Sequence, residues 1–189
     1  MFSLSAKRIY FSLLLLVSCM VYITPTLAAS ELSKRSEQIG ANVIFLRHAL
    51  APGYGDPRHF DILNCQTQRN LDQQGRAQAR QIGQFLSQQD IKIDQLLSSR
   101  WCRCTETAAL LGIGALTTFD GLNSFFEAHV SRDETLEKLN GYLDALPQDK
   151  IHLLVTHQVV ISAITGISPP SGGFVLYNSQ TKQALSFGL

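Results

Sequence analysis

The sequence predicts an α/β fold, specifically a three-layer α/β/α sandwich around a mostly parallel central sheet. Short apolar runs rich in β-branched residues, as at 43–46 and 151–156, alternate with longer segments of helical periodicity. Both runs end abruptly at polar residues, as buried strands do when they deliver side chains to one edge of a sheet. Strands that alternate with helices in this way form parallel sheets with helices on both faces.

The first half of the chain shows three such elements. Val43-Ile44-Phe45-Leu46 predicts a buried strand that ends at Arg47-His48. Residues 51–70 are rich in Gly, Pro, Asp and Asn and predict a long loop, and loops of that length are often functional. After the N-cap Asp72, small and apolar residues recur at helical spacing over 75–86 and predict an amphipathic helix.

The second half continues the alternation, with clear helix boundaries. Ser131 and Glu134 form a capping box, and the helix that follows is ended by Pro147. The predicted elements are a strand at 93–98, a helix at 105–111 that stops at Gly112, a short strand at 116–119, the helix after Ser131 with its inner stripe of Leu136, Leu139, Leu143 and Leu146, a last strong strand at 151–156, and a helical run at 159–164.

Residues 1–29 have the pattern of a signal peptide. Two basic residues precede an uncharged apolar stretch over 9–24, and Thr26-Leu27-Ala28 provides a cleavage site. We therefore expect a periplasmic or secreted protein with no stable membrane span after signal cleavage. Two alternatives stay open. One is a retained anchor, because the run is just under the roughly 18 to 20 residues of a spanning helix. The other, less expected, is a lipid anchor at Cys19.

The remaining chain divides into a polar lead-in at 30–41 and one domain at 42–189. Without Lys7 and Arg8, this part has 14 basic and 15 acidic side chains, a formal charge of −1. Nucleic-acid binding depends on clustered excess positive charge, so the composition disfavours it.

Three cysteines lie after the signal: Cys65, Cys102 and Cys104. Disulfides persist in an oxidising compartment, and an odd count leaves at least one thiol free or externally paired. A bond from Cys65 to either Cys102 or Cys104 is expected, and the sequence does not decide between them. The spacing is no zinc pattern.

Polar residues follow three predicted strands at the edge where ligands collect in such sheets. They are Arg47-His48, the turn from Ser98 to Arg103, and His157. Taken alone, each is more often an ordinary surface or core residue. Together they supply two arginines and two histidines at equivalent places in the fold, so we expect them to form one site.

Four segments, in order over about residues 42–165, resemble the motifs of the histidine phosphatase superfamily, which includes the phosphoglycerate mutases. Arg47-His48-Ala49 is similar to the family's Arg-His-Gly signature, and Val155-Thr156-His157 to its Val-Ser-His-Gly segment. The family's helix opening resembles Asn70-Leu71-Asp72-x-x-Gly75-x-x-Gln78-Ala79. Its Ser-Ser-Pro segment resembles Ser98-Ser99-x-x-x-Arg103-x-x-x-Thr107-Ala108.

The resemblance implies a role for each matching residue. His48 would attack phosphorus and become a phosphohistidine that water later hydrolyses. Arg47 and Arg103 would hold the phosphoryl oxygens, since the transferred group stays negatively charged throughout. His157 would donate a further hydrogen bond, most usefully as imidazolium.

The leaving group needs a proton, so a carboxylic acid is expected near the pocket. The family places it after the third strand, where Glu127 is the best match. Asp56 and Asp120 are weaker candidates. The loop residues Arg58-His59 and His129 are more simply read as solvated, and His152 as structural.

Two positions depart from the family pattern. Ala49 replaces a glycine, which puts the approach of the backbone to phosphate in doubt. Arg100 stands where proline is usual and is expected to bind substrate, favouring a multiply charged one.

The sequence thus predicts a phosphatase that hydrolyses a phosphomonoester outside the cytoplasm, without metal or cofactor. No cluster of acidic or histidine residues has metal-ligand spacing. Similar exported family members suggest a small sugar phosphate as substrate. The alternative is a catalytically silent phosphate- or phosphopeptide-binding module. A mutase is less expected in so short a chain, and a disulfide oxidoreductase lacks the Cys-x-x-Cys spacing.

Overall fold

Alternate side chains of the central strands pack against opposite layers of helices. The computed structural model describes residues 30–188. In β1 (Val43–Arg47), Ile44 and Leu46 belong to one buried cluster and Val43 and Phe45 to the other. A strand buried on both faces must be apolar throughout, which explains its uninterrupted apolar run.

The six strands form one mixed sheet in the order β3-β2-β4-β1-β5-β6. The pairs β2·β3, β2·β4 and β1·β4 are parallel, whereas β1·β5 and β5·β6 are antiparallel. The bounds of the other strands are β2 Ile93–Ser98, β3 Leu116–Thr118, β4 Ile151–Thr156, β5 Phe174–Tyr177 and β6 Ala184–Phe187.

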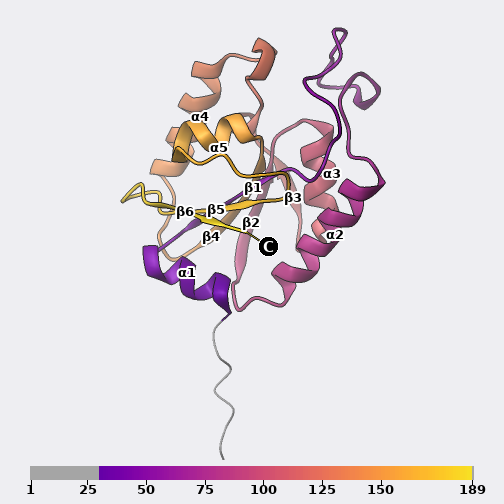
Figure 1. Cartoon of the computed structure of the whole chain (residues 1–189). Coiled ribbons are helices and arrows are strands. Elements are labelled where there is room, and N and C mark those ends of the chain that lie inside the picture. The colour runs from indigo at the N-terminus through magenta and orange to yellow at the C-terminus, as the bar shows by residue number, and fades with distance from the viewer. Residues whose placement is uncertain (1–29, 189) are drawn as a thin grey trace, which may run out of the picture.

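Helices cover both faces of the sheet, as predicted (Figure 1). On one face lie α1 (Glu31–Ile39), α2 (Gln73–Ser87) and α3 (Cys102–Leu111). On the other lie α4 (Arg132–Asp144) and α5 (Gln158–Thr165). Three short 3-10 helices, η1 (Cys65–Thr67), η2 (Asp120–Leu122) and η3 (Phe126–Ala128), lie in the connections.

The predicted helix boundaries depend on local capping, and the structure confirms the N-caps at Asp72 and Ser131. The Asp72 carboxylate accepts a 2.7 Å hydrogen bond from the Gly75 amide, and Ser131 accepts one of 3.3 Å from the Glu134 amide. The αL cap at Gly112 ends α3, as expected, although α3 begins at Cys102 rather than near Thr105.

Three elements were not predicted. The lead-in at 30–41 contains α1, which is capped by Ser30 and buries Leu32 completely. The strands β5 and β6 follow what the sequence indicated as the last strong strand. No helix within residues 30–188 has the length and apolar character to cross a bilayer. The predicted signal and Cys19 lie outside the described residues.

Candidate active site

The carboxyl ends of β1 and β4 bring two histidines together. Arg47 pairs in register with Thr156, and the His48 amide donates a 2.9 Å hydrogen bond to the Thr156 carbonyl. His48 and His157 follow these strands, so their ring centroids lie 5.4 Å apart.

A cavity of about 380 Å³ opens at this edge, a size suited to a small molecule. Four of the residues predicted for the site line it, namely Arg47, His48, Arg103 and His157. Arg69, which was not predicted, is a third arginine in its wall. The remaining wall includes apolar and aromatic side chains, among them Leu50, Pro52, Tyr54, Phe126 and Val159.

His48 has the protonation state of a nucleophile. Its Nδ1 lies 2.7 Å from the Ala49 carbonyl oxygen, which can only accept, so Nδ1 carries the proton and Nε2 has the free lone pair. Burial, followed by the charge of Arg103, lowers the pKa of His48 to about 3. The imidazole is therefore neutral at physiological pH.

His157 is held by a chain of side chains. Ser99 donates to Asn123 Oδ1 at 3.2 Å, so its hydroxyl oxygen accepts from His157 Nε2 at 2.9 Å. The other ring nitrogen, Nδ1, then faces Arg103 Nη2 at 3.4 Å. Burial and the neighbouring Arg103 lower the pKa of His157 well below its ordinary value, so it is neutral here and not the expected imidazolium.

Arg103 is bound to a carboxylate that was considered only as a weak acid candidate. Its Nη1 donates to Asp56 Oδ1 at 2.9 Å and its Nη2 to Oδ2 at 3.2 Å. Both side chains are about 95% buried. Asp56 is further bonded by Trp101 Nε1 and by the Arg69 amide.

The charge of Asp56 follows from this pairing. Burial disfavours the carboxylate, but the hydrogen bonds and charge of Arg103 outweigh burial and keep the pKa of Asp56 below its ordinary value. A carboxylate held ionised in this way is a poor proton donor.

Two arginine donors are buried without a partner among residues 30–188: Nε of Arg47 and Nε of Arg103. Arg47 uses Nη1 for the Pro169 carbonyl, and Arg69 donates to the carbonyls of Ala51 and Gly55. Three guanidinium groups against the one Asp56 carboxylate leave a net charge of +2 around the neutral histidines. Buried unpaired cationic donors fit an anion such as a phosphate dianion.

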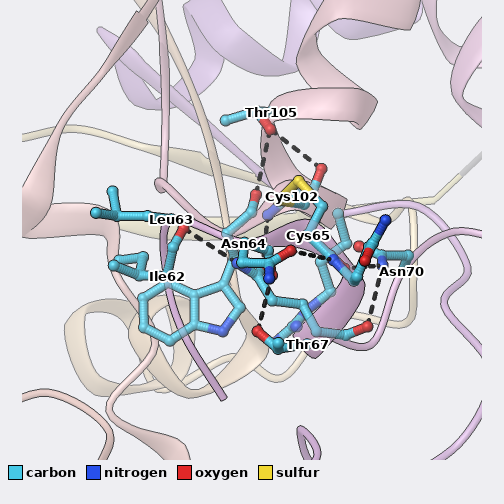
Figure 2. The surroundings of a disulfide bond; sticks show 12 residues. Ile62, Leu63, Asn64, Cys65, Thr67, Asn70, Cys102 and Thr105 are labelled. Atoms are coloured by element: carbon cyan, nitrogen blue, oxygen red, sulfur yellow. Dashed lines mark hydrogen bonds between the residues drawn. A yellow bond between two sulfur atoms is a disulfide. The ribbon is translucent and has the colours of Figure 1, made fainter. Parts of the chain in front are cut away.

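A disulfide fastens the long loop beside this site. Cys65 in η1 bonds to Cys102, the residue before Arg103, which settles the alternative left open by the sequence (Figure 2). Gln68 accepts a 2.9 Å hydrogen bond from the Cys102 amide. The remaining thiol, Cys104, is buried, and burial raises its pKa to about 12. A neutral, enclosed thiol gives no support to the oxidoreductase reading.

The other motif residues hold the loop after β1. Thr107 Oγ1 accepts from the Ala49 amide at 3.0 Å, and Gln78 Oε1 accepts from the Leu50 amide at 2.8 Å. A Cβ at Gly75 would lie 1.9 Å from the Leu50 carbonyl oxygen, so only glycine allows α2 to approach this closely.

Ala49 causes no difficulty at the site. Its φ is not positive, so the turn does not need glycine. The side chain is fully buried in a small cluster with Ala51, Leu71 and Ala79. It is not part of the cavity wall.

Of the three acidic candidates, only Glu127 has no arginine partner. Asp56 pairs with Arg103, and Asp120 pairs with Arg100 at 2.6 Å. Glu127 is not itself a lining residue but lies next to one, Phe126, at the rim of the cavity. The Glu127 carboxylate accepts a hydrogen bond from the Asp56 amide at 3.0 Å. Its φ of +60° is uncommon for a residue other than glycine, and such backbone strain clusters at functional sites.

Several sequence candidates are not brought to the cavity. Arg100 faces Asp120, which corrects its prediction as a substrate-binding residue. Arg58 and His59 are exposed on the loop. His129 stacks on Phe60, with centroids 4.3 Å apart. His152 is buried within β4 and bonds to Tyr142.

The described chain, residues 30–188, groups no three His, Cys, Asp or Glu side chains as metal ligands. Arg69 and the pairing of Asp56 were missed because no motif marks them: both lie in the loop and reach the site only through its folding. The run of polar residues before Asn70 offered no periodic signal.

Solved structures with the same fold include three bacterial phosphatases. The protein histidine phosphatase SixA in complex with tungstate has 17% identity and a TM-score of 0.52, over 77% of this chain and 94% of that one. A mycobacterial glucosyl-3-phosphoglycerate phosphatase has 13% identity and a TM-score of 0.53, over 77% and 96%. A protein from Agrobacterium tumefaciens, provisionally described as the phosphohistidine phosphatase SixA, has 20% identity and a TM-score of 0.55, over 79% of this chain and 97% of that one. At these identities the likeness shows the fold alone.

The comparison with curated proteins gave no match. A family model described as "Histidine phosphatase superfamily (branch 1)" matches residues 43–140, more than half of the chain, and this range holds Arg47, His48 and Arg103. The chain belongs to the histidine phosphatase superfamily.

Proposed function

We propose that this chain is a phosphatase that hydrolyses a small phosphomonoester through a phosphohistidine on His48, without a metal and outside the cytoplasm. The observation that carries the proposal is the state of His48. A neutral imidazole with a free Nε2 stands in a cavity with two buried, unpaired arginine donors. Nucleophile and anion site are thus provided together.

The reaction follows from these positions. Nε2 of His48 attacks phosphorus while the bond to the ester oxygen breaks, and the phosphoryl oxygens are held by Arg47 and Arg103. Nδ1 keeps its proton and donates it in a hydrogen bond to the Ala49 carbonyl oxygen throughout, so the new phosphohistidine keeps its orientation. Water then attacks phosphorus, the P–N bond breaks, and inorganic phosphate leaves a neutral His48.

Glu127 is the proposed proton donor to the leaving oxygen. In the second step, its carboxylate would accept a proton from the attacking water. The support is its place at the rim without an arginine partner, in contrast to Asp56 and Asp120. With Glu127→Gln, kcat for an alkyl phosphate should fall about 100-fold, while p-nitrophenyl phosphate, whose leaving group needs no proton, should lose far less.

The cavity favours a small substrate. Its volume of about 380 Å³ suits a metabolite, and Tyr54 packs edge-on against Phe126 with centroids 5.2 Å apart in its wall. A sugar ring could pack on such a pair. Sugar phosphates are therefore our proposed class, and comparison of kcat/KM for hexose phosphates, linear alkyl phosphates and a phosphohistidine peptide would test it.

The proposed location rests on the signal-like residues 1–29, and the Cys65–Cys102 disulfide supports it. Disulfides form and persist mainly in oxidising compartments. Fractionation of expressing cells, with N-terminal sequencing of the product, should give a protein in the periplasm or medium that starts near residue 29. Recovery from the cytoplasm with the segment attached would contradict the location.

The decisive experiment is hydrolysis of an aryl phosphate in EDTA, with acid quenching to detect labelled protein. We expect activity and an acid-labile phosphoryl group on the wild type, and a loss of at least about a thousandfold in His48→Ala. His59→Ala, an exposed loop histidine, is the matched control and should retain activity. Tungstate binding without any hydrolysis would instead support the silent module.

A further inference from the structure

The long loop supplies the only carboxylate that touches the arginines of the cavity within the described chain. Asp56 is 5% exposed and uses both oxygens on Arg103. It is fixed in turn by the Trp101 indole at 3.0 Å and by the Arg69 amide at 2.9 Å. The Asp56 carboxylate is thus held by hydrogen bonds from three different residues.

This pairing determines which edge of the Arg103 guanidinium is free. Asp56 occupies the end that carries Nη1 and Nη2. The side that carries Nε and the second Nη2 hydrogen is left, where Nε has no partner and Nη2 faces His157 Nδ1. Nε is therefore the donor of this edge that is left to bind a phosphate oxygen, while the second Nη2 hydrogen is directed at His157.

We propose that Asp56 is a positioning residue, which holds the Nε edge of Arg103 toward the transferred phosphoryl group. The inference rests on the proposed function for its consequence in turnover, but its effect on anion binding is independent of turnover. Asp56 does not contact the reacting atoms in this scheme and acts only through Arg103.

The loop must be docked for Asp56 to reach Arg103. The Cys65–Cys102 bond joins the loop to α3 one residue before Arg103 (Figure 2). Phe60 stacks on Trp101, with ring centroids 5.0 Å apart. Asp56 and its arginine are therefore tied to the same short stretch of α3 by covalent, aromatic and polar contacts.

The alternative role for Asp56 is simple charge balance among the arginines, and it predicts the opposite result. Removing a negative charge beside an anion site strengthens anion binding by electrostatics alone. Removing a positioning residue weakens it, since a small misplacement of a binding group can cost about 100-fold in rate.

The test is tungstate affinity by calorimetry together with kcat/KM for an aryl phosphate. For Asp56→Asn, we expect tungstate to bind at least about tenfold more weakly and kcat/KM to fall about 100-fold. Asp61→Asn is the matched control, because this exposed loop carboxylate accepts only from backbone amides such as Leu63 and should change neither value. Equal or tighter tungstate binding by folded Asp56→Asn overturns the proposal.

A second substitution of Asp56 separates positioning from charge balance. Asp56→Glu retains the charge but displaces the carboxylate, so positioning predicts about tenfold weaker tungstate binding, whereas charge balance predicts no change. If Asp56→Asn does not fold, wild-type affinity in Asp56→Glu overturns the proposal.

A double-mutant cycle with Arg103→Lys addresses the edge itself. Lysine has no planar fork for Asp56 to orient, so adding Asp56→Asn to Arg103→Lys should weaken tungstate binding by less than about threefold beyond the effect of Arg103→Lys alone. Losses that simply multiply would overturn the role of the Nε edge. If wild type binds tungstate but turns over no ester, the proposed function fails while these binding comparisons still apply.

Discussion

The two halves of the active site are held in different ways. His48 and His157 stand at the ends of adjacent parallel strands, where the backbone pairing of β1 with β4 fixes them. Asp56 and Arg69 stand on the loop over 51–70, which has no strand pairing. Side-chain hydrogen bonds and one disulfide hold this loop in place.

This difference separates chemistry from orientation. The strand half contributes the nucleophile and its neighbouring histidine, buried and neutral, at positions that any slip in strand register would destroy. The loop half holds Arg103 through Asp56 and, in the reaction we propose, carries no reacting atom. Loops vary in sequence more readily than strands. Substitutions in the loop can therefore change which substrate is bound, while the chemistry at the strand ends stays the same.

The largest expected effect is the loss of stability at low pH caused by the buried histidines of the strand half. Burial lowers the pKa of His48 to about 3 and that of His157 well below its ordinary value. The unfolded chain, with a histidine pKa of about 6.5, takes up protons first as pH falls. The contribution of His48 to stability should therefore be constant above about pH 7, and between pH 6.5 and 4.5 it should fall by about 2–3 kcal/mol; the contribution of His157 should fall in the same direction.

Urea denaturation as a function of pH measures this fall. His48→Asn removes the contribution of His48, so its free energy of unfolding should decline less steeply over the same range. The same slope in the variant and the wild type would contradict the assignment of a strongly lowered pKa to His48.

The next largest effect is expected from removing the disulfide that holds the loop half. The double substitution Cys65→Ser with Cys102→Ser should lower the free energy of unfolding by about 2–4 kcal/mol, because the disulfide restricts the unfolded chain. It should also lower kcat/KM, since the loop carries Asp56. Dithiothreitol should reproduce both changes in the wild type and should have no further effect on the double variant, which is the control. Full activity in the reduced wild type would show that the other contacts suffice.

A smaller effect is expected from a substitution at the rim of the cavity, where the loop residue Gly55 contacts Glu127. Gly55 has φ +68°, and a Cβ there would lie 2.4 Å from Glu127 Oε1. Gly55→Ala should displace Glu127 and lower kcat for alkyl phosphates about tenfold, with little change for p-nitrophenyl phosphate.

Gly53→Ala is the matched variant for backbone strain. Its φ is +93°, but the nearest atom to a Cβ is Arg69 Cδ at 3.6 Å. It should lose about 1 kcal/mol of stability, as Gly55→Ala does through φ alone, while keeping the wild-type dependence on the leaving group. Similar kinetics for both variants would argue against Glu127 as the acid.

The smallest effect is expected at Arg100, which faces Asp120 rather than the cavity. Arg100→Ala should change kcat/KM less than about twofold for mono- and polyanionic substrates, because exposed ion pairs contribute little. Arg69→Ala, whose side chain lines the cavity, should lose much more. A selective loss with polyanions in Arg100→Ala would restore its predicted role in substrate binding.

Sequence reasoning succeeded where the signals are local. The N-caps Asp72 and Ser131, the cap at Gly112 and the apolar strands predicted the elements, and the strand ends predicted that His48, Arg103 and His157 would meet. Each of these depends on residues a few positions apart or on the general geometry of parallel sheets.

It failed where the structure depends on distant partners. The strands β5 and β6 are short and pair antiparallel at one side of the sheet, and α1 is specified by the burial of Leu32 rather than by a long apolar stripe. The choice of Cys102 over Cys104 and the pairing of Asp56 follow from how the loop folds onto α3. The neutral state of His157 follows from its burial and from the charge of Arg103.

The sheet order also determines when the site can form during synthesis. Both neighbours of β1, namely β4 and β5, begin after residue 150. Until the ribosome has made them, the strand before His48 is an apolar segment with two unpaired edges, the kind of segment that aggregates or recruits chaperones. His48 is thus encoded near the start of the domain but acquires its setting only after β4 and β5 have been made.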